Sequence, residues 1–251
     1  ASIFFAKNKT ANNWLNDADP ELVNCYITIR DQSDDLIKSL ASEEASKERH
    51  TFYKNEFKPK NKIESALRWY YLNRTSYSGI MNMKNCFWGY GDKYSMRPEN
   101  WPRNIQRTSA KLQGVKITNY DFKQVLDEVD DNAFLFIDPP YFNADQDKFY
   151  EYSFIKDDHF GLAKILKDHS RRLKFIVTYD DCPEIRELYS WATEIHDKAW
   201  NYTLNRTDDQ RKNAKQKRGT RYKGRELFIL NYSSGLEKRE TSESALIGEI
   251  E

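Results

Sequence analysis

Residues 133–141 join an apolar run to a carboxylate, two prolines and an aromatic ring, in the order Ala-Phe-Leu-Phe-Ile-Asp-Pro-Pro-Tyr. The run 133–137 predicts a fully buried strand, because it is short, continuous and rich in aromatic side chains. Asp138 would then stand at the carboxyl end of this strand. Pro139 and Pro140 follow it, fix φ and donate no N–H, and Tyr141 comes next. These residues could form either one edge of a ligand site or a proline-rich turn after a core strand.

Two more acids are expected at the ends of strands. The segment 11–17 reads as a short strand that closes on Asp17, and 114–122 alternates into a strand that ends at Asp121. Ligands of open α/β sheets bind outside the carboxyl ends of the strands, so three acids at that edge favour a binding site. The alternatives are ordinary turn chemistry, a helix N-cap for Asp121, and Asp19 in place of Asp17, although Asp19 also suits an N-cap before Pro20.

The elements that would position these acids alternate along the chain. Strand and helix patterns follow each other from residue 11 to about 190, and 193–204 and 224–233 read as two closing strands. This order predicts an α/β fold, a doubly wound Rossmann-like sheet with a C-terminal antiparallel hairpin. Residues 64–102 are rich in aromatics, Asn and Gly and have weak periodicity, which favours an insertion over a layer of the core.

Composition narrows the class of protein. The 251 residues carry a net charge of +1 and are 31% charged. No apolar run approaches the roughly 20 residues of a membrane helix, and no signal peptide is visible. The three cysteines are widely spaced, which disfavours a disulfide framework and a structural zinc site. We therefore expect a cytoplasmic protein without a metal. The segment 205–226 has nine Lys/Arg against three acids, which suits a solvated loop or a nucleic-acid contact.

The string Asp138-Pro139-Pro140-Tyr141 resembles motif IV of methyltransferases that use S-adenosylmethionine to modify amino groups, in the form typical of adenine N6 enzymes. "YLNR" at 71–74 is the second sharp match. Weaker matches occur in the expected order at 2–5, 14–23, 119–122, 152–166 and 218–232. Over about residues 2–232 the chain resembles the DNA adenine N6-methyltransferase family of the alpha arrangement, the Dam-like D12 class.

This resemblance implies how the site works. Asp138 and the Pro139 carbonyl would accept the two hydrogens of the adenine amine, with Pro140 keeping the turn rigid. Tyr141 would stack on a base flipped out of the duplex. The cofactor S-adenosylmethionine would be bound by Asp17 at its ribose and by Asp121 and Phe122 at its adenine, together with Asp138 and Phe154. No metal is required.

The resemblance also implies a double-stranded DNA partner and a domain division. Residues 1–40 and 103–234 would form the catalytic domain, 41–102 a mainly helical target-recognition insertion, and 235–251 a polar tail. The expected DNA-binding residues combine positive charge, amide groups and aromatic rings. They are Asn73, Arg74, Tyr77, Lys84, Trp88, Lys93, Arg218, Arg221 and Lys223. Local capping by Asn73 and Arg74, and packing by the aromatic residues, are the alternatives.

The chain departs from the family in lacking the "FxGxG" cofactor loop, and it has only nine glycines. We therefore expect that an N-terminal segment carrying this loop is supplied separately or precedes Ala1. The leading hypothesis is a site-specific DNA adenine methyltransferase of a restriction-modification system. The alternatives are methylation of adenine in RNA, methylation of cytosine N4, and a non-catalytic nucleic-acid-binding module. The recognition sequence and the oligomeric state are not predicted.

Overall fold

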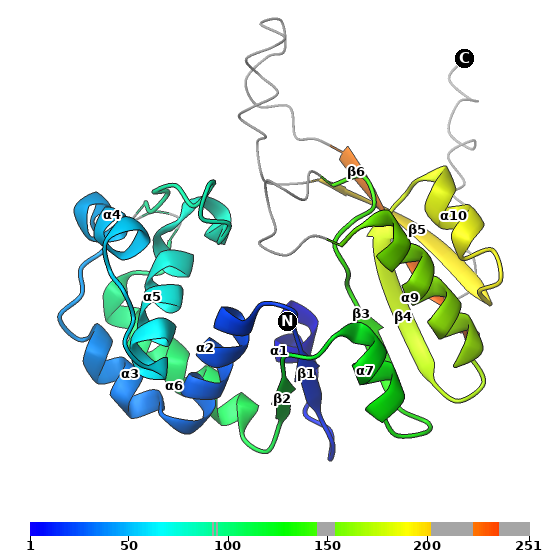
Figure 1. Ribbon diagram of the computed structural model, residues 1–251, viewed down its shortest axis with the longest axis horizontal. Helices are drawn as coiled ribbons and strands as arrows, with labels where there is room; N and C mark the ends of the chain where they lie inside the picture. Colours follow the sequence, from blue (N-terminus) through cyan, green and yellow to red (C-terminus); the bar gives the residue numbers. More distant parts are fainter. Residues whose placement is uncertain (92, 94, 145–153, 202–222, 236–251) are drawn as a thin grey trace, which may run out of the picture.

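The computed structural model describes residues 1–91, 93, 95–144, 154–201 and 223–235 (Figure 1). The elements of the first half are α1 (Ser2–Ala6), β1 (Trp14–Asn16), α2 (Pro20–Asp31), α3 (Ser33–Leu40), α4 (Lys47–Asn55), α5 (Lys62–Thr75), η1 (Tyr77–Gly79), η2 (Pro98–Asn100), α6 (Trp101–Leu112) and β2 (Lys116–Thr118). Those of the second half are α7 (Phe122–Glu128), β3 (Phe134–Ile137), α9 (Lys156–Asp168), β4 (Lys174–Asp180), α10 (Pro183–Leu188), β5 (Glu194–Asn201) and β6 (Lys223–Leu230). Within these ranges no helix combines the length and the apolar composition that a membrane crossing requires.

The mixed α/β class predicted from the sequence is confirmed, and the described strands form two sheets. β1 and β2 pair in parallel, and a second sheet has the order β3-β4-β6-β5. In this sheet β3 is parallel to β4, whereas β6 runs antiparallel to both β4 and β5. The single doubly wound sheet stays a prediction. The connection between β5 and β6 lies outside the described residues, so the closing hairpin also stays a prediction.

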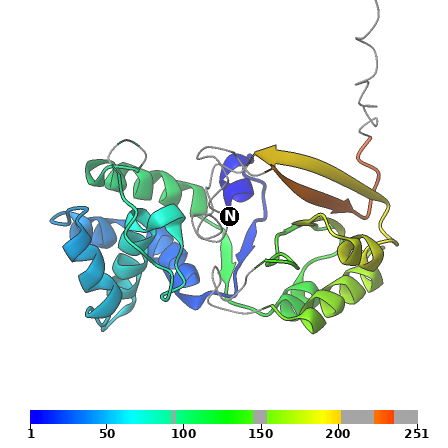
Figure 2. The same cartoon turned by 90° about the horizontal axis from the view of Figure 1, so that it is seen from above.

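Both views of the ribbon place the same two parts on opposite sides. Helices α2 to α6 form one part, the sheet of β3 to β6 with α9 and α10 forms the other, and β1 and β2 lie between them (Figures 1 and 2). Each part has its own core. The buried side chains of the first core include Leu36, Tyr71 and Trp101, and those of the second include Leu162, Phe175 and Ile229.

Helix α5 lies at the centre of the first core. The sequence favoured an insertion over a layer of the core for 64–102, and this stays a prediction, since α5 packs in the first cluster and not in that of the sheet. Ala66, Leu67, Tyr70, Tyr71 and Leu72 are all buried in the first cluster. Weak periodicity has a physical reason here, because α5 is covered by neighbours on several sides, so apolar and aromatic residues occur around most of its circumference.

Strand β3 is less buried than its apolar sequence predicted. Phe134 is 57% exposed and Phe136 is 38% exposed, whereas Leu135 and Ile137 are half-buried against the second core. Side chains alternate between the two faces of a strand. One face of β3 therefore packs on the second core, while the two phenylalanines line a cavity on the other face.

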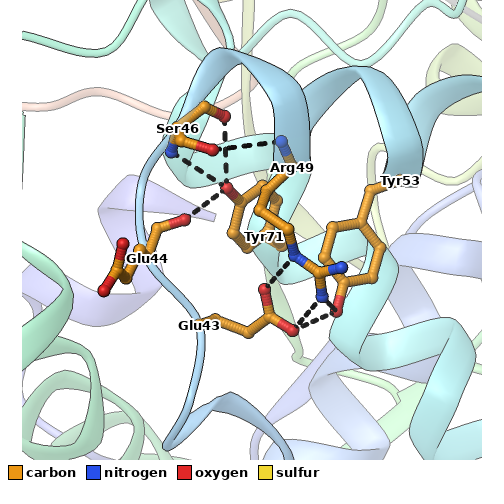
Figure 3. Close-up of polar contacts among 6 residues, drawn as sticks. All are labelled: Glu43, Glu44, Ser46, Arg49, Tyr53 and Tyr71. Carbon is orange, nitrogen blue, oxygen red and sulfur yellow. Dashed lines mark hydrogen bonds and ion pairs between the residues drawn. The ribbon is translucent and has the colours of Figure 1, made fainter.

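A polar network fixes the segment before α4 to α4 and α5 (Figure 3). The Glu43 carboxylate, whose side chain is 7% exposed, accepts from Arg49 Nε at 2.8 Å and from the Tyr53 hydroxyl at 2.7 Å. The Tyr71 hydroxyl donates to the Glu44 carbonyl at 2.7 Å. Ser46 caps α4 by accepting from the Arg49 amide at 3.1 Å.

Candidate active site

A cavity of about 2280 Å³ receives side chains from both parts of the molecule. This is more than the volume that one small ligand occupies, which is about 300–1,000 Å³. The structure brings nine of the predicted site residues to its lining. They are Asp17, Asn73, Arg74, Asp121, Phe122, Asp138, Pro139, Pro140 and Phe154. The cavity thus joins the residues predicted for the cofactor to those predicted for the target amine.

Asp138 follows β3 and is held by a hydroxyl of the neighbouring strand. Thr178 Oγ1 donates to Asp138 Oδ1 at 2.6 Å, and Thr178 Oγ1 also lies 3.4 Å from the Ile137 carbonyl oxygen. Thr178 is only 4% exposed, whereas Asp138 is exposed toward the cavity. Thr178 was not among the residues predicted from the sequence, although it lies on β4, the strand that pairs with β3.

The loop after the prolines is fixed by a second residue of β4. Asp180 Oδ1 accepts from the Phe142 amide at 2.9 Å. Asp180 Oδ2 accepts from the Asn143 side chain at 2.9 Å and from its amide at 3.3 Å. Tyr141 is half-buried in this loop and does not belong to the cavity lining. Asp180 was also missed, although the signal that identified Asp17, Asp121 and Asp138, an acid at a strand end, applies to it.

Asp17 follows β1 and opens onto the cavity. Its Oδ1 accepts from the Asp19 amide at 3.0 Å. Partial burial raises the pKa of the Asp17 carboxyl, although the hydrogen bond from the Asp19 amide opposes this rise. Asn119 Nδ2 donates to the carbonyls of Asp17 at 2.8 Å and Ala18 at 2.9 Å, so it ties the end of β1 to that of β2. Asp19 caps α2, as predicted, and accepts from the Glu21 amide at 2.8 Å.

Asp121 caps α7, which was the alternative reading of this acid. Its Oδ1 accepts from the Lys123 amide at 2.9 Å. The cap and the predicted cofactor role are compatible, since a carboxylate has two oxygens with several acceptor sites. Phe122 and Phe154 contact each other with ring centroids 5.6 Å apart, and both pack on the second core while lining the cavity. The two rings form an apolar wall of the cavity that Asp17 and Asp121 also line.

The end of α5 faces the same cavity. Arg74 places its guanidinium over the Tyr70 ring, 5.4 Å from the centroid, and its buried Nε has no hydrogen-bond partner among the described residues. Asn73 Nδ2 reaches the Gly79 carbonyl only at 3.4 Å. Both residues line the cavity, so Arg74 offers a positive group to whatever enters from the side of the helices.

The turn that carries Tyr77 is hydrogen-bonded through its backbone to residues 87–89. The Tyr77 amide donates to the Phe87 carbonyl at 2.8 Å, and the Gly89 amide donates to the Thr75 carbonyl at 3.0 Å. A Cβ atom at Gly89 would lie 2.2 Å from Tyr77 Cα, so only glycine fits this approach. The Tyr77 side chain is 40% exposed.

The remaining predicted DNA contacts divide between exposed and packed positions. Lys84 and Lys93 are exposed, whereas Trp88 is half-buried and packs on His50 with ring centroids 5.8 Å apart. An antiparallel bridge joins Ser76 to Trp88. Arg218 and Arg221 lie outside the described residues, as does the side chain of Lys223, whose backbone begins β6.

A family model covers most of the chain. The model of the D12 class N6 adenine-specific DNA methyltransferases matches residues 1–204. This span includes every described residue of the cavity lining.

Individual relatives agree with this match. The chain is 28% identical to the Type II methyltransferase M.MjaIII of Methanocaldococcus jannaschii over 177 residues, which are 63% of this chain and 61% of that relative. It is 28% identical to the Type II methyltransferase M.CviBI of Paramecium bursaria Chlorella virus NC1A, over 75% of this chain and 72% of the relative. It is 25% identical to the Type II methyltransferase M1.LlaDCHI of Lactococcus lactis subsp. cremoris, over 88% of this chain and 79% of the relative. The first of these alignments spans less than two thirds of the relative's length.

Proposed function

The chain belongs to the family of D12 class N6 adenine-specific DNA methyltransferases, and on that premise we propose that it methylates the N6 amine of an adenine flipped out of a specific duplex DNA sequence. Enzymes of this family use S-adenosylmethionine. The observation that carries the proposal is one shared cavity, which is lined by Asp138 and Pro139 as well as by Asp17 and Asp121. Its relatives are named as Type II methyltransferases, which supports a modification role in a restriction system of the cytoplasm.

Asp138 and Pro139 would act on the target amine. The adenine amine is a poor nucleophile because its lone pair is delocalised into the ring. Two acceptors that bind its two hydrogens favour a tetrahedral nitrogen, whose lone pair is then free to react. The prolines keep the Pro139 carbonyl in place, and Thr178 holds one oxygen of Asp138 at 2.6 Å. The residues therefore contribute orientation and preorganised charge rather than covalent chemistry.

The other acids would hold the cofactor. S-adenosylmethionine, when bound, supplies an electrophilic methyl group. Asp17 would accept hydrogen bonds from the ribose hydroxyls, and Asp121 one from the adenine amine. Phe122 and Phe154, whose rings are in contact, would pack against the adenine face. The donor set fits this ligand, because two carboxylates and an apolar wall line one cavity.

We infer that a further strand lies between β1 and β3. Among the described residues β1 pairs only with β2, and β3 only with β4. Trp14 and Asn16 of β1 line the same cavity as Phe134 and Phe136 of β3. An extended segment parallel to both would bury the two phenylalanines and join the sheets into one doubly wound, Rossmann-like sheet. Such a strand would carry the glycine loop at its carboxyl end, beside Asp17 and Asp138.

The helical part would read the DNA. The insertion 41–102 supplies Asn73, Arg74, Tyr77, Lys84 and Lys93, and Arg218, Arg221 and Lys223 would contact phosphates. Arg74 is best placed of the described basic residues, because it lines the cavity and its buried Nε has no hydrogen-bond partner among them. Trp88 would support the turn of Tyr77 by packing rather than touch bases.

The experiment that tests this function is nucleoside analysis by mass spectrometry after incubation with tritiated S-adenosylmethionine. Duplex DNA, single-stranded RNA and a duplex lacking adenine are compared, with and without a segment that carries a strand and a glycine loop fused ahead of Ala1. We expect N6-methyladenine in duplex DNA, at a higher rate with the segment. N4-methylcytosine, methylated RNA, or DNA binding with no transfer in either form would replace the proposal with one of the alternatives.

A further inference from the structure

Strand β4 places two polar side chains on either side of the Asp138-Pro139-Pro140-Tyr141 string. Thr178 contacts the carboxylate before the prolines, and Asp180 binds the backbone after Tyr141. We propose that Thr178 and Asp180 are positioning residues, which set the Asp138 carboxylate and the Tyr141 turn for methyl transfer. This inference rests on the proposed function and names residues of the same site that neither the sequence motif nor the family match identifies.

Thr178 determines which oxygen of Asp138 is available. Its hydroxyl donates to Oδ1 at 2.6 Å, and hydrogen bonds to a charged oxygen are short and strong. The adenine amine is therefore left with Oδ2 as its first acceptor. Thr178 is buried and β-branched, so its side chain has few alternative rotamers. Ile137 pairs with Val177 in the parallel ladder of β3 and β4, so the next residues of the two segments, Asp138 and Thr178, lie side by side.

Asp180 holds the turn that carries Tyr141. Its carboxylate accepts hydrogen bonds from the backbone amides of Phe142 and Asn143 and from the Asn143 side chain. The Tyr141 carbonyl in turn accepts from the Ala144 amide at 3.1 Å. A turn held by three bonds to one carboxylate cannot swing without losing them together. Because β4 lies within the second core, both contacts tie the string to well-packed residues of that core.

The neighbouring acid provides a matched control. Asp181 is the next residue in the chain after Asp180, and its carboxylate pairs with Arg186 at 2.6 Å. It has no contact with the string among the described residues. Removing the Asp181 carboxylate changes the local charge by the same amount, so it separates a positional effect from a charge effect.

The first arm of the test is single-turnover methyl transfer to duplex DNA. Thr178→Val keeps the shape and loses the hydroxyl, and we expect a rate about 10- to 100-fold lower with DNA affinity within about twofold, since small misplacements near the reacting atoms cost up to about 100-fold. Thr178→Ser, which restores the hydroxyl, should recover most of the rate. Equal rates for Val and wild type, or equal losses of rate and DNA affinity, would overturn the role of Thr178.

The second arm does not depend on turnover. Amide hydrogen exchange at Phe142 and Asn143 should become at least about tenfold faster in Asp180→Ala, because the opening of this turn loses its partners. It should stay within about twofold of wild type in Asp181→Ala. Unchanged exchange in Asp180→Ala would overturn the inference. No methyl transfer by wild type, either alone or with the fused segment, would instead contradict the proposed function, and the exchange measurement would still decide the positioning role.

Discussion

Asp138 can act as an acceptor because the residues around it leave one part of its carboxylate available. The side chain is exposed toward the cavity, while Thr178 engages only Oδ1. A rigid acceptor lowers the barrier because it is already oriented before the amine arrives. Pro139 would contribute in the same way, since its ring fixes φ.

The aromatic ring of Tyr141 is predicted to stack on the flipped base. Tyr141→Leu should weaken binding of a flipped adenine, because stacking of a base on an aromatic ring contributes about 1–3 kcal/mol. Tyr141→Phe keeps the ring and should bind like wild type. The fluorescence of 2-aminopurine at the target position measures base flipping. Equal fluorescence for the leucine and phenylalanine variants would show that Tyr141 does not stack on the base.

Among the elements, the turn of η1 depends on a close approach of two backbones. Gly89→Ala places a methyl group 2.2 Å from Tyr77 Cα, so the segment 87–89 must move away from Thr75 and Tyr77. We expect a loss of about 1–3 kcal/mol in the free energy of unfolding, as for other overpacked sites, and weaker DNA binding. Chemical denaturation and a DNA titration measure these two effects.

Gly91→Ala is the matched control for this change. No atom of the described residues lies within 4 Å of a Cβ atom at Gly91, so the free energy of unfolding of this variant should stay within about 0.5 kcal/mol of wild type. If the two alanine variants were equally stable, the close approach at Gly89 would not support the turn.

The network before α4 gives a second prediction for the elements. Glu43→Gln removes the charge that Arg49 and the Tyr53 hydroxyl share (Figure 3). We expect a loss of about 1–3 kcal/mol in the free energy of unfolding, less than for a fully buried pair, because Arg49 is 39% exposed and partly screened by water. Glu44→Gln, one residue away and exposed, should leave stability unchanged in the same denaturation experiment. A similar loss in both variants would contradict the assignment to this network.

Much of the secondary structure could be predicted from local pattern, and the contacts between distant segments could not. Asp19 before Pro20 predicted the start of α2 correctly, because a cap and a proline act through the nearest backbone atoms. The exposure of Phe134 and Phe136 was missed, because burial depends on which strands lie beside β3. Thr178 and Asp180 were missed for the same reason, since their partners are 37 to 41 residues away in the chain.

For the molecule as a whole, two buried histidines should couple stability to pH. Burial lowers the pKa of both His50 and His159 below the ordinary 6.5. His50 contacts Thr75 Oγ1 at 2.9 Å in the first core region, and His159 contacts the Tyr179 hydroxyl at 2.8 Å in the second. Below about pH 6.5 the unfolded chain binds protons that the folded chain does not. The free energy of unfolding should therefore fall as the pH is lowered through this range.

The expected slope is at most about 1.4 kcal/mol per pH unit for each histidine. His50→Gln and His159→Gln should each reduce it, and the double variant should reduce it most. Urea denaturation at a series of pH values from about 7.5 to 5.5 measures the slope. A slope that is unchanged in the double variant would show that these two histidines do not control acid stability.

The arrangement of the two parts explains why one cavity can hold so many of the predicted residues. The strand ends of β1, β2 and β3 carry Asp17, Asp121 and Asp138 to it from one side, and α5 brings Arg74 from the other. Cofactor, target base and DNA backbone would thus meet where the sheets face the helices (Figure 2).

The most direct test of the account is the rate of methyl transfer to duplex DNA by Asp138→Asn. Asparagine keeps the size of the side chain and one oxygen but loses the charge, so the rate should fall by about 100- to 1,000-fold, with DNA affinity and melting temperature close to wild type. Asp127→Asn, an exposed acid on α7, should methylate at the normal rate. An Asp138→Asn variant that methylates adenine as fast as wild type would contradict the central claim that this carboxylate binds the target amine.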